Sequence, residues 1–146
     1  MYRICFICHG NICRSPMAEF MLKDKVKKLG KSDEFIIDSM AVSREEIGND
    51  IYPPAKDKLK EKGIDFSKRR ARQITSNDYQ NYDYIICMDK SNLRYLSYLI
   101  DDYDHKVSML LDRDIADPWY TGDFEATYKD LDEGLDDFLQ ELIFNG

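Results

Sequence analysis

The sequence predicts a single-domain α/β protein, a three-layer sandwich in which a four-stranded parallel sheet has helices on both faces. Short apolar runs alternate with amphipathic runs along the chain, and this alternation is typical of strand–helix–strand units. The length of 146 residues suits one hydrophobic core. No linker, repeat or low-complexity segment divides the chain, so we expect residues 1–146 to form one domain.

Four apolar runs are predicted to be the strands, and they cover residues 2–7, 35–41, 84–88 and 106–111. The first run is interrupted only by Arg3, as expected of a strand that is buried on both faces. Ligands of parallel sheets bind at the carboxyl ends of the strands. The loops after these four runs are therefore the expected location of a site.

Amphipathic runs between and after the strands are predicted to be helices. The first of them starts near Pro16, which suits a first helical turn, and stops at Gly30. The last is the clearest, because its apolar residues recur at helical spacing from Tyr128 to Leu142. The expected helices are residues 17–29, 53–63, 93–100 and 128–142, with a short one near 75–78; residues 43–52, 67–73 and 112–123 are expected to be loops.

Composition and charge disfavour several classes of function. The net charge of −7 is unusual for a nucleic-acid-binding protein. No run has the length of a membrane span, and the first residues lack the features of a signal peptide, so we expect a cytoplasmic protein without membrane or nucleic-acid partners. The four cysteines lack zinc spacing and are expected to be reduced thiols, and we expect no metal and no cofactor.

Residues 8–16, with the sequence Cys-His-Gly-Asn-Ile-Cys-Arg-Ser-Pro, follow the first strand and open the first helix. Gly10 and Asn11 tolerate the left-handed backbone that a tightly curled anion-binding loop requires. The positive end of the helix would face this loop. Arg14 can bind two oxygens of an anion with its forked guanidinium. The segment therefore predicts a phosphate-binding loop.

Cys8 opens this loop and is a candidate nucleophile. Cysteines beside a helix N-terminus and a cation have pKa values lowered to roughly 3.5–7.5, which favours the reactive thiolate. Ser15 could donate a hydrogen bond to that thiolate. The alternative is a buried thiol and an exposed arginine around a turn, which would need none of the strand, Gly-Asn and Ser-Pro context found here.

Phosphoryl transfer to Cys8 needs a proton for the leaving oxygen, and Asp117 is the candidate general acid. It lies in the loop expected after the fourth strand and is followed by Pro118. Trp119 and Tyr120 come next and could form the walls of a slot for a flat leaving group. The alternative is an ordinary Asp-Pro turn with solvated aromatic side chains.

These residues resemble the low-molecular-weight protein tyrosine phosphatases, and the resemblance extends from end to end of the chain. Besides the loop and the segment that begins at Asp117, matching segments occur in the family's order at residues 38–39, 46–49, 71–73 and 87–89. The family implies a flavodoxin-like fold of the phosphotyrosine protein phosphatase I-like kind. It also implies Cys8 as nucleophile, Arg14 as phosphate clamp and Asp117 as general acid.

The resemblance further implies a set of supporting residues. The phosphate-binding loop would consist of His9, Gly10, Asn11, Ile12, Cys13 and Ser15. Asn11 and Ser39 would hold the shape of the loop, and Ser15 would stabilise the thiolate. Asp89 would brace the loop, although from the residues alone it could equally order Arg14 or cap the next helix.

Cys13 resembles a loop cysteine that forms a reversible disulfide with the nucleophile in this family. From the residues alone, redox protection of a reactive thiol and a small buried side chain are equally good interpretations.

Three residues depart from the family's pattern and bear on substrate preference. Arg69 stands where many members have a histidine that supports the loop asparagine, so we expect that contact to be altered or lost. Glu45 stands where an aromatic wall is often found, and Trp119 replaces the more usual tyrosine. Trp119 and Tyr120 are then the aromatic residues expected to hold the substrate's phenyl ring. The basic residues of segment 68–72 could attract acidic residues near a phosphotyrosine or could simply be solvated.

The expected function is hydrolysis of phosphotyrosine, and of small aryl phosphates, through a cysteinyl-phosphate intermediate, with a phosphotyrosine-containing protein as partner. Phosphoarginine phosphatases share the scaffold but typically have a threonine where this chain has Ile12. Thiol-dependent arsenate reduction on this fold needs two further cysteines close together, and Cys87 is the last cysteine of the chain. A non-catalytic phosphate-binding module would not need Cys8, Arg14 and Asp117 together.

Overall fold

The computed structural model, which describes residues 1–144, contains a four-stranded sheet. The strands are β1 (Tyr2–Cys8), β2 (Phe35–Ala41), β3 (Tyr84–Cys87) and β4 (Val107–Met109), in the order β2-β1-β3-β4. All three pairings are parallel. β1 lies inside the sheet and is buried from Ile4 to Cys8, as its continuous apolar pattern predicts.

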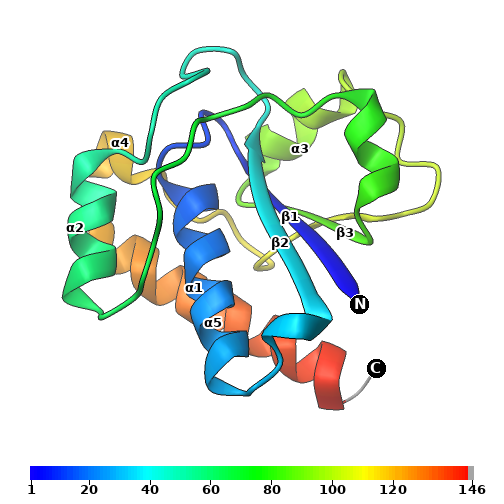
Figure 1. Cartoon of the computed structure of the whole chain (residues 1–146). Helices are drawn as coiled ribbons and strands as arrows, with labels where there is room; N and C mark the ends of the chain where they lie inside the picture. Colours follow the sequence, from blue (N-terminus) through cyan, green and yellow to red (C-terminus); the bar gives the residue numbers. More distant parts are fainter. Residues whose placement is uncertain (145–146) are drawn as a thin grey trace.

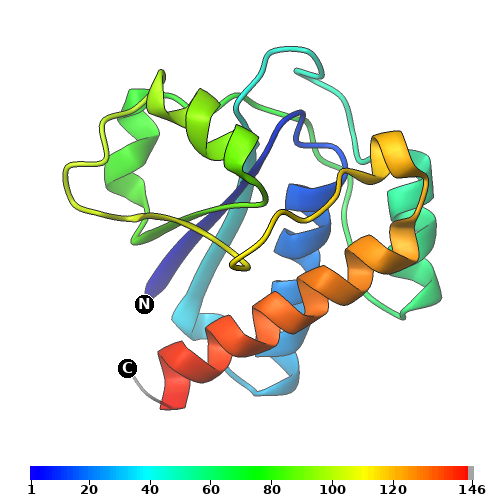
Figure 2. The same ribbon diagram turned by 180° about the vertical axis from the view of Figure 1, so that it is seen from behind.

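Helices cover both faces of the sheet and give the molecule three layers (Figures 1 and 2). The helices are α1 (Arg14–Lys28), α2 (Pro53–Glu61), α3 (Lys90–Ser97), α4 (Pro118–Thr121) and α5 (Phe124–Phe144), with the 3-10 helices η1 (Ser32–Glu34) and η2 (Ser76–Asn81). One face of the sheet packs against α1, α2 and α5, and the other packs against η2 and α3. The predicted α/β sandwich is confirmed.

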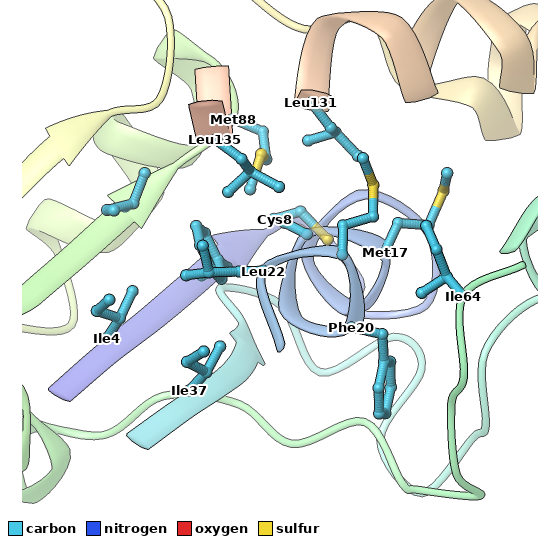
Figure 3. Packing of buried hydrophobic residues seen from close by; sticks show 14 of the residues in the cluster. Ile4, Cys8, Met17, Phe20, Leu22, Ile37, Ile64, Met88, Leu131 and Leu135 are labelled. Carbon is cyan, nitrogen blue, oxygen red and sulfur yellow. The ribbon is translucent and has the colours of Figure 1, made fainter. Parts of the chain in front are cut away.

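The larger part of the core lies between the sheet, α1 and α5. Figure 3 shows Ile4 of β1, Met17 and Leu22 of α1 and Leu135 of α5 within this cluster. Cys8 belongs to the same cluster and is 3% exposed. The candidate nucleophile is therefore anchored at the end of a rigid central strand rather than on a free loop.

Several helix boundaries differ from the sequence-based prediction. α1 begins at Arg14, slightly before the predicted start near Pro16, and Pro16 lies in its first turn as predicted, where a missing N–H is tolerated. α3 ends at Ser97. Ile100 follows outside the helix but is buried, because the segment after α3 turns its apolar side chain into the core.

The predicted loop at residues 112–123 was wrong in part, because it contains the short helix α4. Asp117 caps its N-terminus by accepting the Trp119 N–H, and Pro118 is its first residue. Gly122 ends it with a φ of 72°, a left-handed conformation that suits glycine. Within residues 1–144, no helix combines the length and apolar character needed to cross a membrane.

The parallel sheet brings the loops that follow its strands together at the carboxyl ends of those strands. In the register of β1, Ile7 pairs with Cys87 of β3 and Cys8 pairs with Ala41 of β2. The segment after β2 continues alongside, since the Val42 N–H donates to the Cys8 carbonyl at 3.1 Å. Residues that follow three strands therefore meet at the carboxyl end of β1, as expected for a parallel sheet.

Candidate active site

Residues 9–13 form the loop that connects β1 to α1. Asn11 has a φ of 59°, the left-handed conformation predicted for it, whereas Gly10 has no positive φ and that part of the prediction was wrong. A Cβ at Gly10 would lie 3.2 Å from Glu46 Cγ, so this glycine instead allows a close approach of Glu46. Within residues 1–144, the N–H groups of residues 12–15 donate no hydrogen bond, which leaves them for an anion.

Cys8 Sγ is surrounded by hydrogen-bond donors. The Asn11 N–H donates to it at 3.3 Å, and Ser15 Oγ lies 3.0 Å away. Asn11 Nδ2 donates to Ser15 Oγ at 2.8 Å, so the hydroxyl accepts there and its own proton is directed to Cys8 Sγ. These donors and the N-terminus of α1 favour a negatively charged sulfur.

The side chain of Asn11 is held from the sheet side by a chain of hydrogen bonds. Asn11 Nδ2 donates to Ser39 Oγ at 2.9 Å. Ser39 Oγ in turn donates to Glu19 Oε1 at 2.7 Å. The two residues predicted to hold the loop shape, Asn11 and Ser39, are thus in direct contact, and the sequence reasoning missed Glu19.

Arg69 holds the other end of Asn11, so the supporting contact is altered but not lost. Its guanidinium donates to Asn11 Oδ1 and, at 3.3 Å, to the Asn49 carbonyl. The Arg69 N–H also donates to Asp50 Oδ1 at 3.2 Å. Burial lowers the pKa of Arg69, which is consistent with a cation held inside the protein beside the loop.

The basic residues of segment 68–72 are not one continuous surface. Arg69 points to Asn11, and Arg72 forms an ion pair with Asp78 at 2.7 Å. Lys68 and Arg70 remain exposed. Two of the four cations therefore bind other parts of the chain, and this weakens the idea of a basic surface for acidic substrate residues.

Replacing Arg69 with methionine is expected to lower kcat/KM for an aryl phosphate about tenfold. A hydrogen bond to a charged group contributes about 1.5–3 kcal/mol, and its loss would free Asn11 to leave the left-handed conformation. Initial rates and thermal unfolding would measure both effects. Arg70→Met is the matched control, because it removes the same charge from an exposed neighbour. Equal losses in the two variants would contradict a specific role of Arg69.

Arg14 is 2% exposed and lines the same pocket as Cys8. Its Nη1 donates to Asp89 Oδ2 at 2.6 Å and to the Ile115 carbonyl at 2.7 Å. These bonds use both protons of Nη1, and apart from a 3.5 Å contact of Nη2 with Asp117 Oδ2, the edge formed by Nε and Nη2 is left for two oxygens of an anion. Burial opposes the charge of Arg14, but Cys8, Asp89 and Asp117 together raise its pKa, so it stays a cation.

Asp89 fulfils both of the roles that the sequence left open. Its Oδ2 accepts from Arg14 Nη1, and its Oδ1 accepts the Asn92 N–H at 2.7 Å as the N-cap of α3. One carboxylate therefore fixes the start of a helix and the orientation of the clamp.

Asp117 lies opposite the loop at the N-terminus of α4. Its Oδ1 accepts the Trp119 N–H at 3.0 Å, and its Oδ2 lies 3.5 Å from Arg14 Nη2. The side chain is 23% exposed and lines the pocket with Cys8. More than a hundred residues separate Asp117 from Cys8 in the chain, yet the fold brings the two predicted catalytic groups to one cavity.

This cavity has a volume of about 100 Å³, and the predicted wall residues Trp119, Tyr120 and Glu45 all line it. The Trp119 ring packs against Tyr52, with 4.7 Å between the ring centroids, and Tyr52 packs in turn against Phe124. The sequence reasoning missed Tyr52, whose role depends on a contact between distant segments. Tyr52 therefore packs behind Trp119, one of the aromatic side chains that line the pocket near Asp117.

His9 and Glu45 form a polar part of the pocket rim. His9 Nε2 lies 3.1 Å from Glu45 Oε2, and the His9 ring packs edge-on against Tyr95 at 5.7 Å. Glu46 also lines the pocket, although the sequence reasoning did not single it out as a wall residue. This rim is polar, so the pocket has one aromatic wall and one charged wall.

Cys13 lines the pocket beside Cys8, and both are free thiols. Burial, followed by the charge of Cys8, raises the pKa of Cys13, so this second thiol stays protonated at neutral pH. Ile12 is also buried and lines the pocket. Within residues 1–144, no three side chains of His, Cys, Asp or Glu come together as a group that could hold a metal ion.

Comparison with known proteins identifies the class to which this fold and site belong. The family model described as low molecular weight phosphotyrosine protein phosphatase matches residues 3–145. The chain belongs to this family, and the predictions of the family and of a phosphatase are confirmed.

Individual relatives match over nearly their whole length. A low molecular weight phosphotyrosine protein phosphatase of Sus scrofa is 37% identical, over 95% of this chain and 94% of its own. YfkJ of Bacillus subtilis, a low molecular weight protein-tyrosine-phosphatase, is 34% identical over 97% of this chain and 96% of its own. The crystal structure of SP-PTP from Streptococcus pyogenes superposes with a TM-score of 0.89 at 40% identity and covers 98% of this chain and 94% of that chain.

Proposed function

We propose that this enzyme hydrolyses phosphotyrosine in proteins, and small aryl phosphates, in two steps at Cys8. In the first step, Cys8 Sγ attacks phosphorus, the S–P bond forms, and the bond from phosphorus to the phenolic oxygen breaks. Asp117 gives its proton to that oxygen as it leaves. The N–H groups of residues 12–15 and the free edge of Arg14 hold the oxygens of the phosphoryl group.

In the second step, the Asp117 carboxylate accepts a proton from water while the water oxygen attacks phosphorus. The S–P bond breaks, inorganic phosphate leaves and the Cys8 thiolate returns. Asp117 thus acts first as general acid and then as general base. Ser15 and Asn11 stabilise the Cys8 thiolate before it attacks phosphorus and again when it is released, through the hydrogen bonds described above.

One observation carries this proposal: Cys8, Arg14 and Asp117 line a single small pocket although they come from distant parts of the chain. A phosphate-binding module would have no use for a buried thiol facing a carboxylate across that pocket. The names of the relatives, which are phosphotyrosine phosphatases, support the same substrate.

Phosphoarginine hydrolysis is the rival on this scaffold. Ile12 in the loop offers no hydroxyl to orient a guanidinium, and the Trp119 and Tyr120 side chains that line the pocket suit an aromatic ring. Arsenate reduction remains disfavoured, because Cys87 is buried in β3 and no cysteine follows it. Both points favour phosphotyrosine.

The deciding experiment compares one peptide sequence that carries phosphotyrosine, phosphoserine or phosphoarginine, with chelator present throughout. We expect kcat/KM to be highest for phosphotyrosine by at least an order of magnitude, since only this side chain places a phenol against the aromatic wall. A higher value for phosphoarginine would overturn the assignment of substrate but not that of Cys8 as nucleophile.

Asp117→Asn is expected to lower kcat for phosphotyrosine on the order of 10²-fold. The loss should be smaller for aryl phosphates with acidic phenols, because these leave without a proton. The measurement is kcat across phenols of increasing pKa, in the wild type and in the variant. Identical losses for all leaving groups would argue against Asp117 as the proton donor.

Two further assignments belong to this proposal. Cys13 would close a disulfide with Cys8 after oxidation of the nucleophile and so protect it from irreversible damage. The enzyme would act in the cytoplasm, where four reduced cysteines are stable.

A further inference from the structure

A second and larger cavity lies on the flank of the molecule, between the edge of the sheet and the second half of α5. This groove has a volume of about 530 Å³ and shares no lining residue with the catalytic pocket. It exists because β4 is short and lies at the edge of the sheet, while α5 packs over the centre. Figure 2 shows α5 (orange to red) running obliquely across the back of the molecule toward the end of the chain.

Most residues that line the groove are apolar, and polar atoms share its surface with them. Tyr84 of β3 and Phe138 of α5 pack edge to face, with 5.4 Å between their ring centroids. Met109 and Leu110 form the wall on the β4 side. Gly134 brings α5 close to Leu110, because a Cβ at that position would lie 2.6 Å from Leu110 Cγ. The groove thus has the aromatic and flexible apolar lining that binds side chains.

Among residues 1–144, the charged side chains that line the groove are Asp137 and Glu141, one turn apart on α5. Neither forms an ion pair within residues 1–144. The other acidic residues of α5 all have a cationic partner; these residues are Glu125, Asp130, Asp132, Glu133 and Asp136. Like charges at this helical spacing repel each other. Asp137 and Glu141 therefore repel each other, and among residues 1–144 no cationic side chain pairs with either of them.

We infer that this groove docks an extended protein segment in which a lysine or arginine lies next to a large apolar residue. The aliphatic part of the basic side chain would lie along Tyr84 and Phe138, and its charge would meet Asp137 and Glu141. The apolar neighbour would cover Met109. The inference does not depend on the phosphatase reaction, because the groove and the catalytic pocket have separate walls.

A capped pentapeptide, acetyl-Leu-Lys-Val-Lys-Leu-amide, is a suitable probe for titration against the ¹⁵N-labelled full chain. We expect saturable shifts of amide signals from β4 and from residues 134–142 of α5. The same peptide with glutamate in place of lysine should bind at least tenfold more weakly. Turnover of an aryl phosphate should be unchanged by saturating peptide.

The double variant Asp137→Asn/Glu141→Gln should weaken binding of the lysine peptide at least fivefold. Asp130→Asn/Glu133→Gln is the matched control: it removes the same charge from the same helix, at residues that pair with Arg113, and should change affinity less than twofold. Both variants should show wild-type thermal unfolding within a few degrees, since all four side chains lie near the surface.

Three results would overturn the inference. One is the absence of saturable shifts in the groove, and another is equal weakening in both double variants, which would mean unspecific attraction to an acidic protein. The third is a set of concentration-dependent shifts at the groove without peptide, because a second copy of the chain would then be its occupant.

Discussion

Cys8→Ser is expected to lower kcat for an aryl phosphate by on the order of 10⁴-fold or more while binding of inorganic phosphate is retained. A serine hydroxyl is a far weaker nucleophile than a thiolate, and Asp117 has to be protonated in this step to serve as the general acid, so it cannot also take the serine proton. The N–H groups of residues 12–15 and Arg14 would remain in place to hold the oxyanion. Steady-state rates and calorimetric titration with phosphate measure the two parts of this prediction.

Cys13→Ser provides the matched control, because it makes the same change in the same loop. The raised pKa of Cys13 keeps it a thiol, so it takes no part in attack on phosphorus and the variant should retain most of its kcat. After mild oxidation, Cys13→Ser should recover less activity on reduction than the wild type, since it cannot form the protective disulfide. A Cys8→Ser variant with near wild-type turnover would disprove the cysteinyl-phosphate intermediate.

The candidate phosphate-binding loop could be predicted from sequence because its signals are local. A strand, a left-handed residue and a helix start follow each other within residues 8–16, and the structure places them in that order. Asp117 could be predicted for a different reason. Once alternating strands and helices indicate a parallel sheet, the loops after the strands must all lie at the carboxyl ends of the strands. A carboxylate in one of these loops is therefore brought near Cys8.

Contacts between distant side chains could not be predicted in this way. The hydrogen bonds of Asn11 with Arg69, and of Ser39 with Glu19, depend on rotamers and on loop paths that leave no pattern in the sequence. The packing of Tyr52 on Trp119 is of the same kind. These contacts shape the pocket without supplying its reacting groups.

The short helix α4 was missed because it is short, not because its sequence lacks the residues that start and end a helix. Asp117, Pro118 and Gly122 are an N-cap, a first-turn proline and a left-handed stop, and all three were visible in the sequence. Four residues are too few to show a helical period. The helix could therefore have been predicted only from its capping residues.

Arg14→Lys is expected to lower kcat on the order of 10³-fold, although the positive charge is kept. Arg14 donates from Nη1 to Asp89 and Ile115 and offers a second edge to the phosphoryl oxygens. A lysine ammonium is a compact donor and cannot bind Asp89 and Ile115 while it also binds two phosphoryl oxygens. The transition state therefore loses its bidentate hydrogen bonds. Loss of one such donor typically costs 10²–10³-fold. The measurement is kcat and KM, with phosphate affinity measured separately.

Asp89→Asn separates this effect from a simple loss of charge in the pocket. An asparagine has one acceptor oxygen where Asp89 uses two, so it can keep the N-cap of α3 while the charge pair with Arg14 Nη1 is lost and the Ile115 carbonyl still holds that nitrogen. We expect a much smaller fall in kcat than for Arg14→Lys, together with intact thermal unfolding. If Arg14→Lys were as active as Asp89→Asn, the forked contact would not matter and Arg14 would act only through its charge. The buried position of Arg14, 2% exposed with both Nη1 protons already engaged, argues for the fork, because a charge alone would not need an orientation fixed from two sides.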